Sequence, residues 1–175
     1  QGDILYRDGS GLQRLGAGTS GQVLQTGGTG ANPSWINAPS GVVKNIVYAY
    51  DTTQRSTTSG SAVTAGNTLG VTLTPASASS LVYVSFDFSG GIHANQDRFN
   101  AHIFRNNTDL GVIRSQEMRA GSSYSSETPM TINYIDTGNT GSITYTLRIS
   151  ASGHTGYING GGVSKGIGMA IEYVL

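Results

Sequence analysis

The amino-acid sequence predicts an all-β protein: an antiparallel, jelly-roll-like β-sandwich of about eight strands, preceded by an extended N-terminal β-arm. Only 11% of the 175 residues are charged, whereas 26 are glycine and nine are tyrosine. This composition is unusual for helices, whose surfaces are normally rich in Glu, Lys, Ala and Leu. The length suits one domain with a substantial core and a short additional segment.

Two segments alternate apolar and polar residues with the period of two that a half-buried strand requires. In residues 81–88, the sequence LVYVSFDF places four apolar side chains on one face, namely Val82, Val84, Phe86 and Phe88. In residues 143–150, the sequence ITYTLRIS does the same with Ile143, Tyr145, Leu147 and Ile149. Both segments are therefore predicted to be strands that line the core of the sandwich.

Further segments are weaker strand candidates and bring the total to about eight: 42–50, 68–74, 99–104, 112–117, 130–135 and 167–175. The intervening stretches SGG, RNNTD, AGSS, DTGNTG and SGHTGYINGGG supply the Gly, Asn and Asp that turns with positive φ need. Short strands separated by such turns are typical of a sandwich of two sheets. We therefore assign residues 41–175 to a sandwich domain.

Residues 1–40 form a separate, glycine-rich segment. Its apolar residues occur in small groups separated by turns: Ile4-Leu5-Tyr6, Leu12, Leu15, Val23-Leu24 and Trp35-Ile36. So few apolar side chains cannot offset the entropy of an ordered chain by packing on each other, and the segment is expected to become ordered against other chains. Copies of the same chain are the simplest such partners. The predicted interface residues are Leu5, Tyr6, Leu15, Val23, Leu24 and Trp35.

The stretch GAGTSG at residues 16–21 matches the G-x-G-x-x-G pattern of dinucleotide-binding loops. That pattern binds pyrophosphate where a buried strand precedes it and a helix follows it. Here Gly27, Gly28, Gly30 and Pro33 would end any helix, and no acidic residue lies about twenty positions on, where a ribose would need one. We therefore expect no nucleotide and no other cofactor, and we interpret GAGTSG as a tight turn between two short strands, GDILY and GQVLQ.

The order of motifs in residues 1–40 resembles a segment of many tailed-bacteriophage fibre and virion-surface proteins. The shared elements are Gly2-Asp3-Ile4-Leu5-Tyr6, Leu12-Gln13-Arg14-Leu15, Gly18-Thr19-Ser20-Gly21-Gln22-Val23-Leu24 and Pro33-Ser34-Trp35. They cover about a fifth of the chain, and the predicted sandwich is similar in pattern to the head domains that such segments often precede. The resemblance implies a homotrimer without a catalytic role, and hence a structural protein of the virion.

The resemblance leaves two locations open. Capsid decoration proteins are often single short domains, whereas tail fibres are usually much longer chains with their own shaft, so the length favours a capsid decoration (cement) protein on the head surface. The alternative is the receptor-binding distal domain of a tail fibre. The expected partners are other copies of the chain and the phage major capsid protein or other virion proteins, with a host surface glycan in the alternative.

Two tyrosines in polar loops are candidate receptor-binding residues. Tyr124 lies in AGSSYSSE and Tyr157 in SGHTGYINGGG, where an aromatic ring beside Asn or Ser can stack on a sugar or contact a protein. Loops at one end of a sandwich are common recognition surfaces. The other interpretation is that each ring packs on the edge of its own sheet.

The candidate catalytic and metal-binding residues form no familiar pattern. His93, His102 and His154 have spacings that match no known zinc or iron motif, and the acidic residues are scattered along the chain. No cysteine is present, which excludes thiolate catalysis and cysteine-bound zinc. We see no serine in a nucleophile setting, and we expect no catalytic residue and no metal. The histidines are expected to be solvated, and the carboxylates are expected to lie in turns and on the surface. A carbohydrate-active or metal-dependent enzyme ranks third among the functions.

The charges balance, with ten basic and ten acidic side chains. Proteins that bind nucleic acids or anionic membranes in a general way usually carry a strong positive charge. No apolar run approaches the length of a membrane span. We therefore expect neither nucleic acid nor a membrane among the partners.

Overall fold

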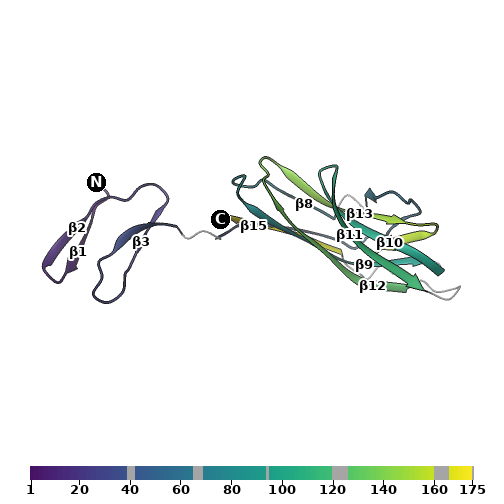
Figure 1. Ribbon diagram of the computed structural model, residues 1–175, viewed down its shortest axis with the longest axis horizontal. Coiled ribbons are helices and arrows are strands. Elements are labelled where there is room, and N and C mark those ends of the chain that lie inside the picture. The colour runs from purple at the N-terminus through teal and green to yellow at the C-terminus, as the bar shows by residue number, and fades with distance from the viewer. Residues whose placement is uncertain (39–41, 65–68, 94, 120–125, 160–165, 175) are drawn as a thin grey trace. The chain divides into compact units, whose positions relative to one another are not determined.

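The computed structural model describes the chain except for residues 39–41, 65–68, 94, 120–125, 160–165 and 175. The described residues form strands and turns, and none of them lies in a helix that is long and apolar enough to span a membrane. They divide into two compact units, Gln1–Ser40 and Gly41–Leu175, which we call the arm unit and the sandwich unit (Figure 1). The arm unit contains β1 (Ile4–Asp8), β2 (Gly11–Leu15), β3 (Gln22–Gln25) and β4 (Ser34–Asn37).

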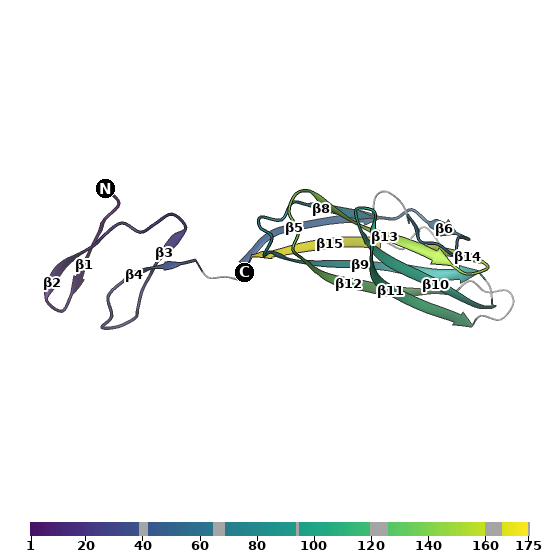
Figure 2. The same ribbon diagram turned by 45° about the horizontal axis from the view of Figure 1, so that its top comes forward.

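Two antiparallel sheets form the sandwich unit (Figure 1, Figure 2). The first sheet has the order β5-β15-β9-β12. The last residues of β9 extend past β15 and pair there with β14, and β14 pairs with β6. The second sheet has the order β11-β10-β13-β8, and β7 also pairs with β13. The strands are β5 (Val42–Asp51), β6 (Arg55–Thr57), β7 (Val63–Thr64), β8 (Gly70–Leu73), β9 (Leu81–His93), β10 (Asn95–Arg105), β11 (Thr108–Arg119), β12 (Ser126–Thr137), β13 (Ile143–Ala151), β14 (Thr155–Ile158) and β15 (Gly166–Val174). The prediction of an all-β, antiparallel sandwich is confirmed.

The strand order shows how the chain moves between the sheets. If β6, β7 and β14 are set aside, consecutive strands lie in opposite sheets, with the β10–β11 hairpin as the exception. In the first sheet, the first strand of the sandwich, β5, pairs with the last strand, β15. β15 also pairs with β9, and β9 pairs with β12. The predicted jelly roll, in which two Greek keys enclose one core, would have this alternation of strands between the sheets.

The core lies between the sheets and is built from alternate residues of the long strands. The two faces predicted from the period of two are buried, and Val84 and Phe86 on β9 and Tyr145 and Leu147 on β13 have no exposed surface. Space in this core is tight. A Cβ at Gly168 would lie 2.7 Å from Phe86 Cε1 on the neighbouring strand. The phenyl ring therefore requires glycine at its cross-strand neighbour.

The arm unit consists of two β-hairpins and differs from the extended arm that the sequence predicted. β1 pairs with β2, and β3 pairs with β4. The side chain of Asp8 accepts hydrogen bonds from the N–H groups of Ser10 and Gly11, at 2.7 and 2.9 Å, and so closes the first hairpin. The prediction that GAGTSG is the turn between GDILY and GQVLQ is wrong, because each of these strands pairs with a different neighbour. GAGTSG instead connects the two hairpins.

Candidate assembly surfaces

Residues that carry the resemblance hold the arm unit together. Trp35 is the chain's one tryptophan, and its Nε1 donates a hydrogen bond of 2.7 Å to the carbonyl of Gly16. The indole lies so close to Gly18 that a Cβ there would be 2.7 Å from Trp35 Cδ2. Asp3 and Arg14 form an ion pair of 2.7 Å. The tryptophan ring therefore packs on the GAGTSG loop, and this contact connects the two hairpins.

The loop lacks the features of a nucleotide site. The N–H of Gln22 donates to the carbonyl of Thr19 at 3.1 Å, and the side-chain oxygen of Gln22 accepts from the N–H of Thr19 at 2.9 Å. Gly21 has a φ of +87°, as the third residue of a type II turn requires. The N–H of Ala17 donates to Asp3 at 3.0 Å. These N–H groups have partners within the arm unit, and strand β3 follows the loop where a phosphate site would need a helix.

Replacing Gly18 with valine is expected to displace the Trp35 ring from the GAGTSG loop, because no room exists for a Cβ at this position. The intrinsic fluorescence of Trp35 should then shift to longer wavelength as the indole becomes hydrated. Gly16→Ala is the matched control, since nothing lies within 4 Å of a Cβ at Gly16. Identical emission spectra for the wild type and Gly18→Val would contradict this account of the loop.

Several apolar side chains of the arm unit are exposed. Of the predicted interface residues, Leu5 is 72% exposed, Leu24 47% and Val23 42%, while Tyr6, Leu15 and Trp35 are half-buried. Leu12, which was not among the predicted residues, is 77% exposed. No side chain among the described residues 1–38 is fully buried. The arm unit thus has local hydrogen bonds and one ring contact but no core of its own.

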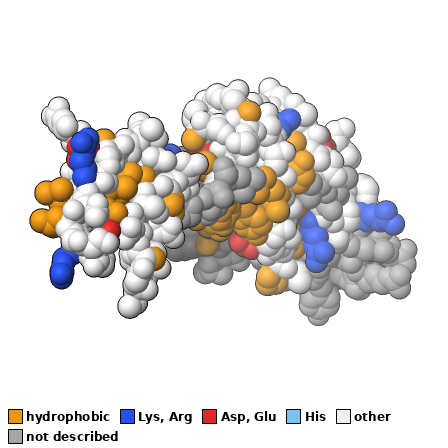
Figure 3. Space-filling model, turned by 60° about the vertical axis from the view of Figure 1, so that its left-hand side comes forward, with side chains coloured by type: hydrophobic (Ala, Val, Ile, Leu, Met, Phe, Trp, Pro, Cys, Tyr) orange, Lys and Arg blue, Asp and Glu red, His pale blue; other side chains and the backbone are white. Residues whose placement is uncertain are grey.

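The outer face of the first sheet is apolar where β5, β15, β9 and β12 lie side by side. The strand registers place Ile46, Ile171, Tyr83 and Ile135 in one row across these strands. We call this surface the apolar face and define it as Val43, Ile46, Tyr48, Tyr50, Leu81, Tyr83, Ile135, Ile167, Met169, Ile171 and Tyr173. Figure 3 shows hydrophobic side chains gathered on the surface of the sandwich.

Both raised and hollow parts occur on the apolar face. Tyr48 is 75% exposed and Tyr50 65%, and both project from β5. An apolar hollow of about 280 Å³ is lined by Leu81, Tyr83, Ile135 and Tyr173. The face can therefore accept an apolar side chain from another protein surface as well as offer one.

A signal for the apolar face is present in the sequence but was not used in the prediction. The segments VVKNIVYAY and IGMAIEYV, which lie in β5 and β15, have apolar residues at both alternating positions, whereas β13 alternates between apolar and polar residues. Strands that are apolar on both faces are normally covered on both sides. Here the inner side faces the core, and the outer side is the apolar face.

The structure describes one of the two candidate receptor tyrosines, Tyr157. Tyr124 lies outside the described residues. Tyr157 lies in β14, between β9 and β6, and is 3% exposed. The prediction that Tyr157 belongs to an exposed recognition loop is wrong. β9 extends beyond the end of β15, and the short β14 pairs with the edge that this extension leaves.

His102 belongs to a polar cluster in the second sheet. Its Nε2 lies 3.1 Å from Ser150 Oγ, and its Nδ1 lies 3.6 Å from Asp109 Oδ2. These residue types form catalytic triads in hydrolases. Here, however, Ser150 is 2% exposed, so a substrate has no access to its hydroxyl, and 3.6 Å is too long for a hydrogen bond. The expectation of a solvated His102 is wrong, because it is 8% exposed within β10, whereas His154 is exposed.

Burial lowers the pKa of His102 below its ordinary value of 6.5, although the nearby Asp109 carboxylate opposes this shift. The unfolded chain therefore binds a proton at a higher pH than the folded chain does. The contribution of neutral His102 to the free energy of unfolding is therefore fully present above pH 6.5. It is lost as the pH falls through the folded pKa, by up to about 1.4 kcal/mol per pH unit.

His102→Gln, which stays neutral, is expected to lose less stability than the wild type between pH 7 and pH 5. Urea denaturation at the two pH values measures this difference. Equal losses for the wild type and His102→Gln would show that His102 does not contribute.

One serine motif was overlooked in the sequence. Gly162-Val163-Ser164-Lys165-Gly166 matches Gly-x-Ser-x-Gly, the nucleophile elbow of α/β-hydrolases. Residues 160–165 lie outside the described residues. The elbow places its serine between a strand and a helix, whereas strand β15 begins at Gly166. The match therefore lacks the context that the elbow requires.

Three carboxylates that the sequence assigned to turns and the surface are buried, namely Asp51, Asp136 and Glu172. Glu172 points into the sandwich from β15 and accepts hydrogen bonds from the Ser80 hydroxyl, at 2.8 Å, and the Ala76 N–H, at 2.6 Å. Among the described residues, no group of three or more His, Asp or Glu side chains is placed to bind a metal ion. Buried acids in this chain thus have hydrogen-bonding partners within the fold.

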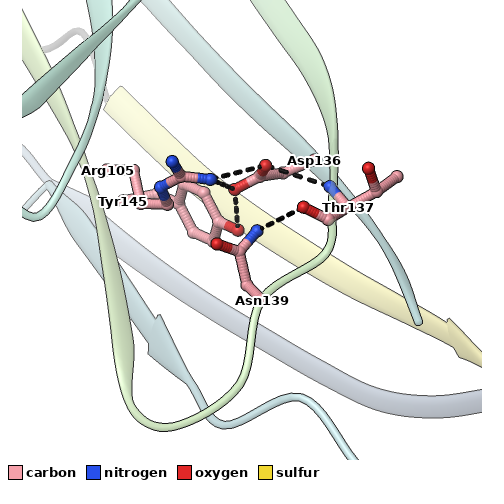
Figure 4. Close-up of polar contacts among 5 residues, drawn as sticks. All are labelled: Arg105, Asp136, Thr137, Asn139 and Tyr145. Carbon is pink, nitrogen blue, oxygen red and sulfur yellow. Dashed lines mark hydrogen bonds and ion pairs between the residues drawn. The ribbon is translucent and has the colours of Figure 1, made fainter. Parts of the chain in front are cut away.

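Asp136 is the centre of a cluster that joins the two sheets (Figure 4). Its carboxylate accepts hydrogen bonds from Arg105 Nη1, at 2.9 and 3.1 Å, from the Tyr145 hydroxyl at 2.7 Å and from the Thr137 N–H at 3.0 Å. Asn139 donates to the carbonyl of Thr137 at 2.8 Å. Burial and, secondly, the hydrogen bond to Asp136 raise the pKa of Tyr145 above its ordinary value. The arrangement is that of a structural link between β12 and the strands β10 and β13.

Comparisons with known proteins establish no family. No protein-family model matches the chain, and a comparison with curated proteins gave no match. Solved structures of infectious bursal disease virus VP2, as a subviral particle, and of the Gx strain of that virus have TM-scores of 0.45 and 0.42 and identities of 15% and 16%. They cover 94% of this chain and 40% and 43% of their own chains.

Dimeric latent PorU from Porphyromonas gingivalis has a TM-score of 0.39 and an identity of 11%, over 79% of this chain and 14% of its own. The chain therefore spans less than half the length of each of these structures. Similarity at this level carries no argument about function.

Proposed function

We propose that the chain is a non-enzymatic structural protein of a tailed-bacteriophage virion, namely a homotrimeric capsid decoration protein whose arm unit attaches it to the shell. The arm unit is the observation that supports this proposal. Motif residues that resemble phage virion-surface proteins fold there into two hairpins, with Leu5, Leu12 and Leu24 left exposed. A unit without a core gains stability by packing against other proteins.

The energetics suit attachment through the arm unit. Full burial of an apolar side chain contributes about 1.5 to 3 kcal/mol, and the three chains of a trimer multiply the number of such side chains. Association costs at least several kcal/mol in lost freedom. In a trimer, the three arm units are linked, so this entropic cost arises once for all three. Weak contacts by each arm unit therefore add up to a high affinity for the shell.

Quantitative gel analysis of purified virions tests the proposal. A shell decoration protein is expected in hundreds of copies per particle. A few dozen copies or fewer, found in isolated tails but not in DNA-filled heads, would identify the alternative, the receptor-binding distal domain of a tail fibre. Absence of the chain from both heads and tails would contradict a role in the virion altogether.

A further inference from the structure

We propose that the apolar face is the surface through which copies of this chain contact one another, with Tyr48 of one copy seated in the hollow of the next. This inference assumes the same homotrimer as the proposed function, but it does not require that the chain is part of a virion. It concerns the sandwich unit alone. The residues of the face come from four strands that are far apart in the sequence and adjacent in the first sheet.

The exposed area fits an interface between proteins. Tyr48 and Tyr50 are 75% and 65% exposed, and Ile46, Ile135 and Ile167 are 56%, 59% and 46% exposed. Since a tyrosine can bury about 150 to 250 Å², the whole face exposes on the order of 800 Å². Each partner in a standard-size protein interface buries about 800 Å², and the largest apolar patch of a typical monomer is about 300 to 600 Å². The face is thus large for a monomer, and in a ring of three chains its exposed area is shared between the contacts to the two neighbours.

The shape fits a cyclic trimer. A ring of three identical chains needs two different, complementary surfaces on each chain, because contacts in such a ring are head-to-tail. The apolar face offers both, with projecting tyrosines on β5 and the hollow between β15, β9 and β12. Neighbouring strands are about 4.8 Å apart, so the raised and hollow parts lie roughly 5 to 15 Å from each other. An aromatic ring in an apolar pocket is a typical centre of binding energy.

The charges also fit a second copy of this chain. Lys44 and Asp87 lie near opposite ends of the apolar face and have opposite signs, and the whole chain has a net charge of zero. Identical neutral chains therefore meet without strong repulsion. The residues that define the face carry no charge.

Disulfide cross-linking of the full chain tests the inference, because the chain has no native cysteine. Ile46 lies two residues from Tyr48, and Thr137 lies opposite Leu81 at the hollow. These two residues are three strands apart in the sheet, about 14 Å, which is too far for a disulfide within one chain. The double variant Ile46→Cys/Thr137→Cys keeps Tyr48 and the residues that line the hollow, and mild oxidation is expected to give covalent trimers on a non-reducing gel. Thr72→Cys/Ser115→Cys is the matched control, since these exposed residues are also three strands apart, in the second sheet. The control should remain monomeric on the gel.

Sedimentation equilibrium gives an independent measurement. Tyr48→Asp is expected to raise the dissociation constant of the trimer by about 30-fold to 1,000-fold, as loss of a central aromatic contact does. Thr72→Asp should leave that constant unchanged, and circular dichroism should show that both variants are folded.

Several results would overturn the inference: a wild-type chain that stays monomeric, equal cross-linking of the two cysteine pairs, or a trimer unaffected by Tyr48→Asp. If Tyr48→Asp formed normal trimers that no longer bound particles, the face would contact the shell instead, and the proposed function would stand. If the trimer depended on the face but the chain were absent from virions, the inference would hold and the proposed function would fail.

Discussion

Replacing Asp136 with alanine is expected to lower the free energy of unfolding of the sandwich unit by about 3 kcal/mol. The substitution removes the acceptor of Arg105 and of the buried Tyr145 hydroxyl, so both donors lose their partner between the two sheets. An unpaired buried polar group costs about 1 to 3 kcal/mol, and an unpaired charge costs more. Urea denaturation followed by far-ultraviolet circular dichroism measures the change.

Asp136→Asn is the informative control for this prediction. The amide keeps the shape of the carboxylate and one acceptor for Tyr145, but it removes the charge that faces Arg105. Its loss of stability should therefore lie between those of the wild type and Asp136→Ala. A change of less than about 1 kcal/mol for Asp136→Ala would show that the link between the sheets is weak.

Removing residues 1–40 is expected to abolish attachment to phage particles and to leave the sandwich unit folded. The buried core residues lie between Leu69 and Ala170, and no arm residue belongs to them. The shortened protein should therefore keep its far-ultraviolet spectrum and its urea midpoint. Co-sedimentation with particles that lack the protein measures attachment.

A milder change separates attachment from the fold of the arm unit. Leu5 and Leu24 are exposed, so the variant Leu5→Ser/Leu24→Ser should keep the fluorescence of Trp35 in the free protein while binding particles at least 100-fold more weakly. The matched control is Thr29→Ala, at an exposed polar residue of the same unit. An arm-deleted protein that sedimented with particles as the wild type does would show that the arm unit is not the attachment segment.

The alternating patterns in the sequence were sufficient to identify the strands that line the core. Residues 81–88 and 143–150 put every second side chain on one face, and those faces are buried in β9 and β13. The composition was likewise enough for the all-β class, because few helix-forming residues are present. The arm segment also stood apart in the sequence, since its sparse apolar residues cannot form a core.

Tertiary structure decided which strands became neighbours, and with them the surfaces. β5, β9, β12 and β15 are separated by dozens of residues, so no local pattern shows that their outer side chains form one apolar face. The same holds for Tyr157 and Asp136, which local sequence placed in polar turns but which neighbouring strands cover. Gly18 is required because Trp35 lies over it from the second hairpin. Local periodicity reports which side of a strand is apolar, whereas burial depends on what the rest of the chain places against that side.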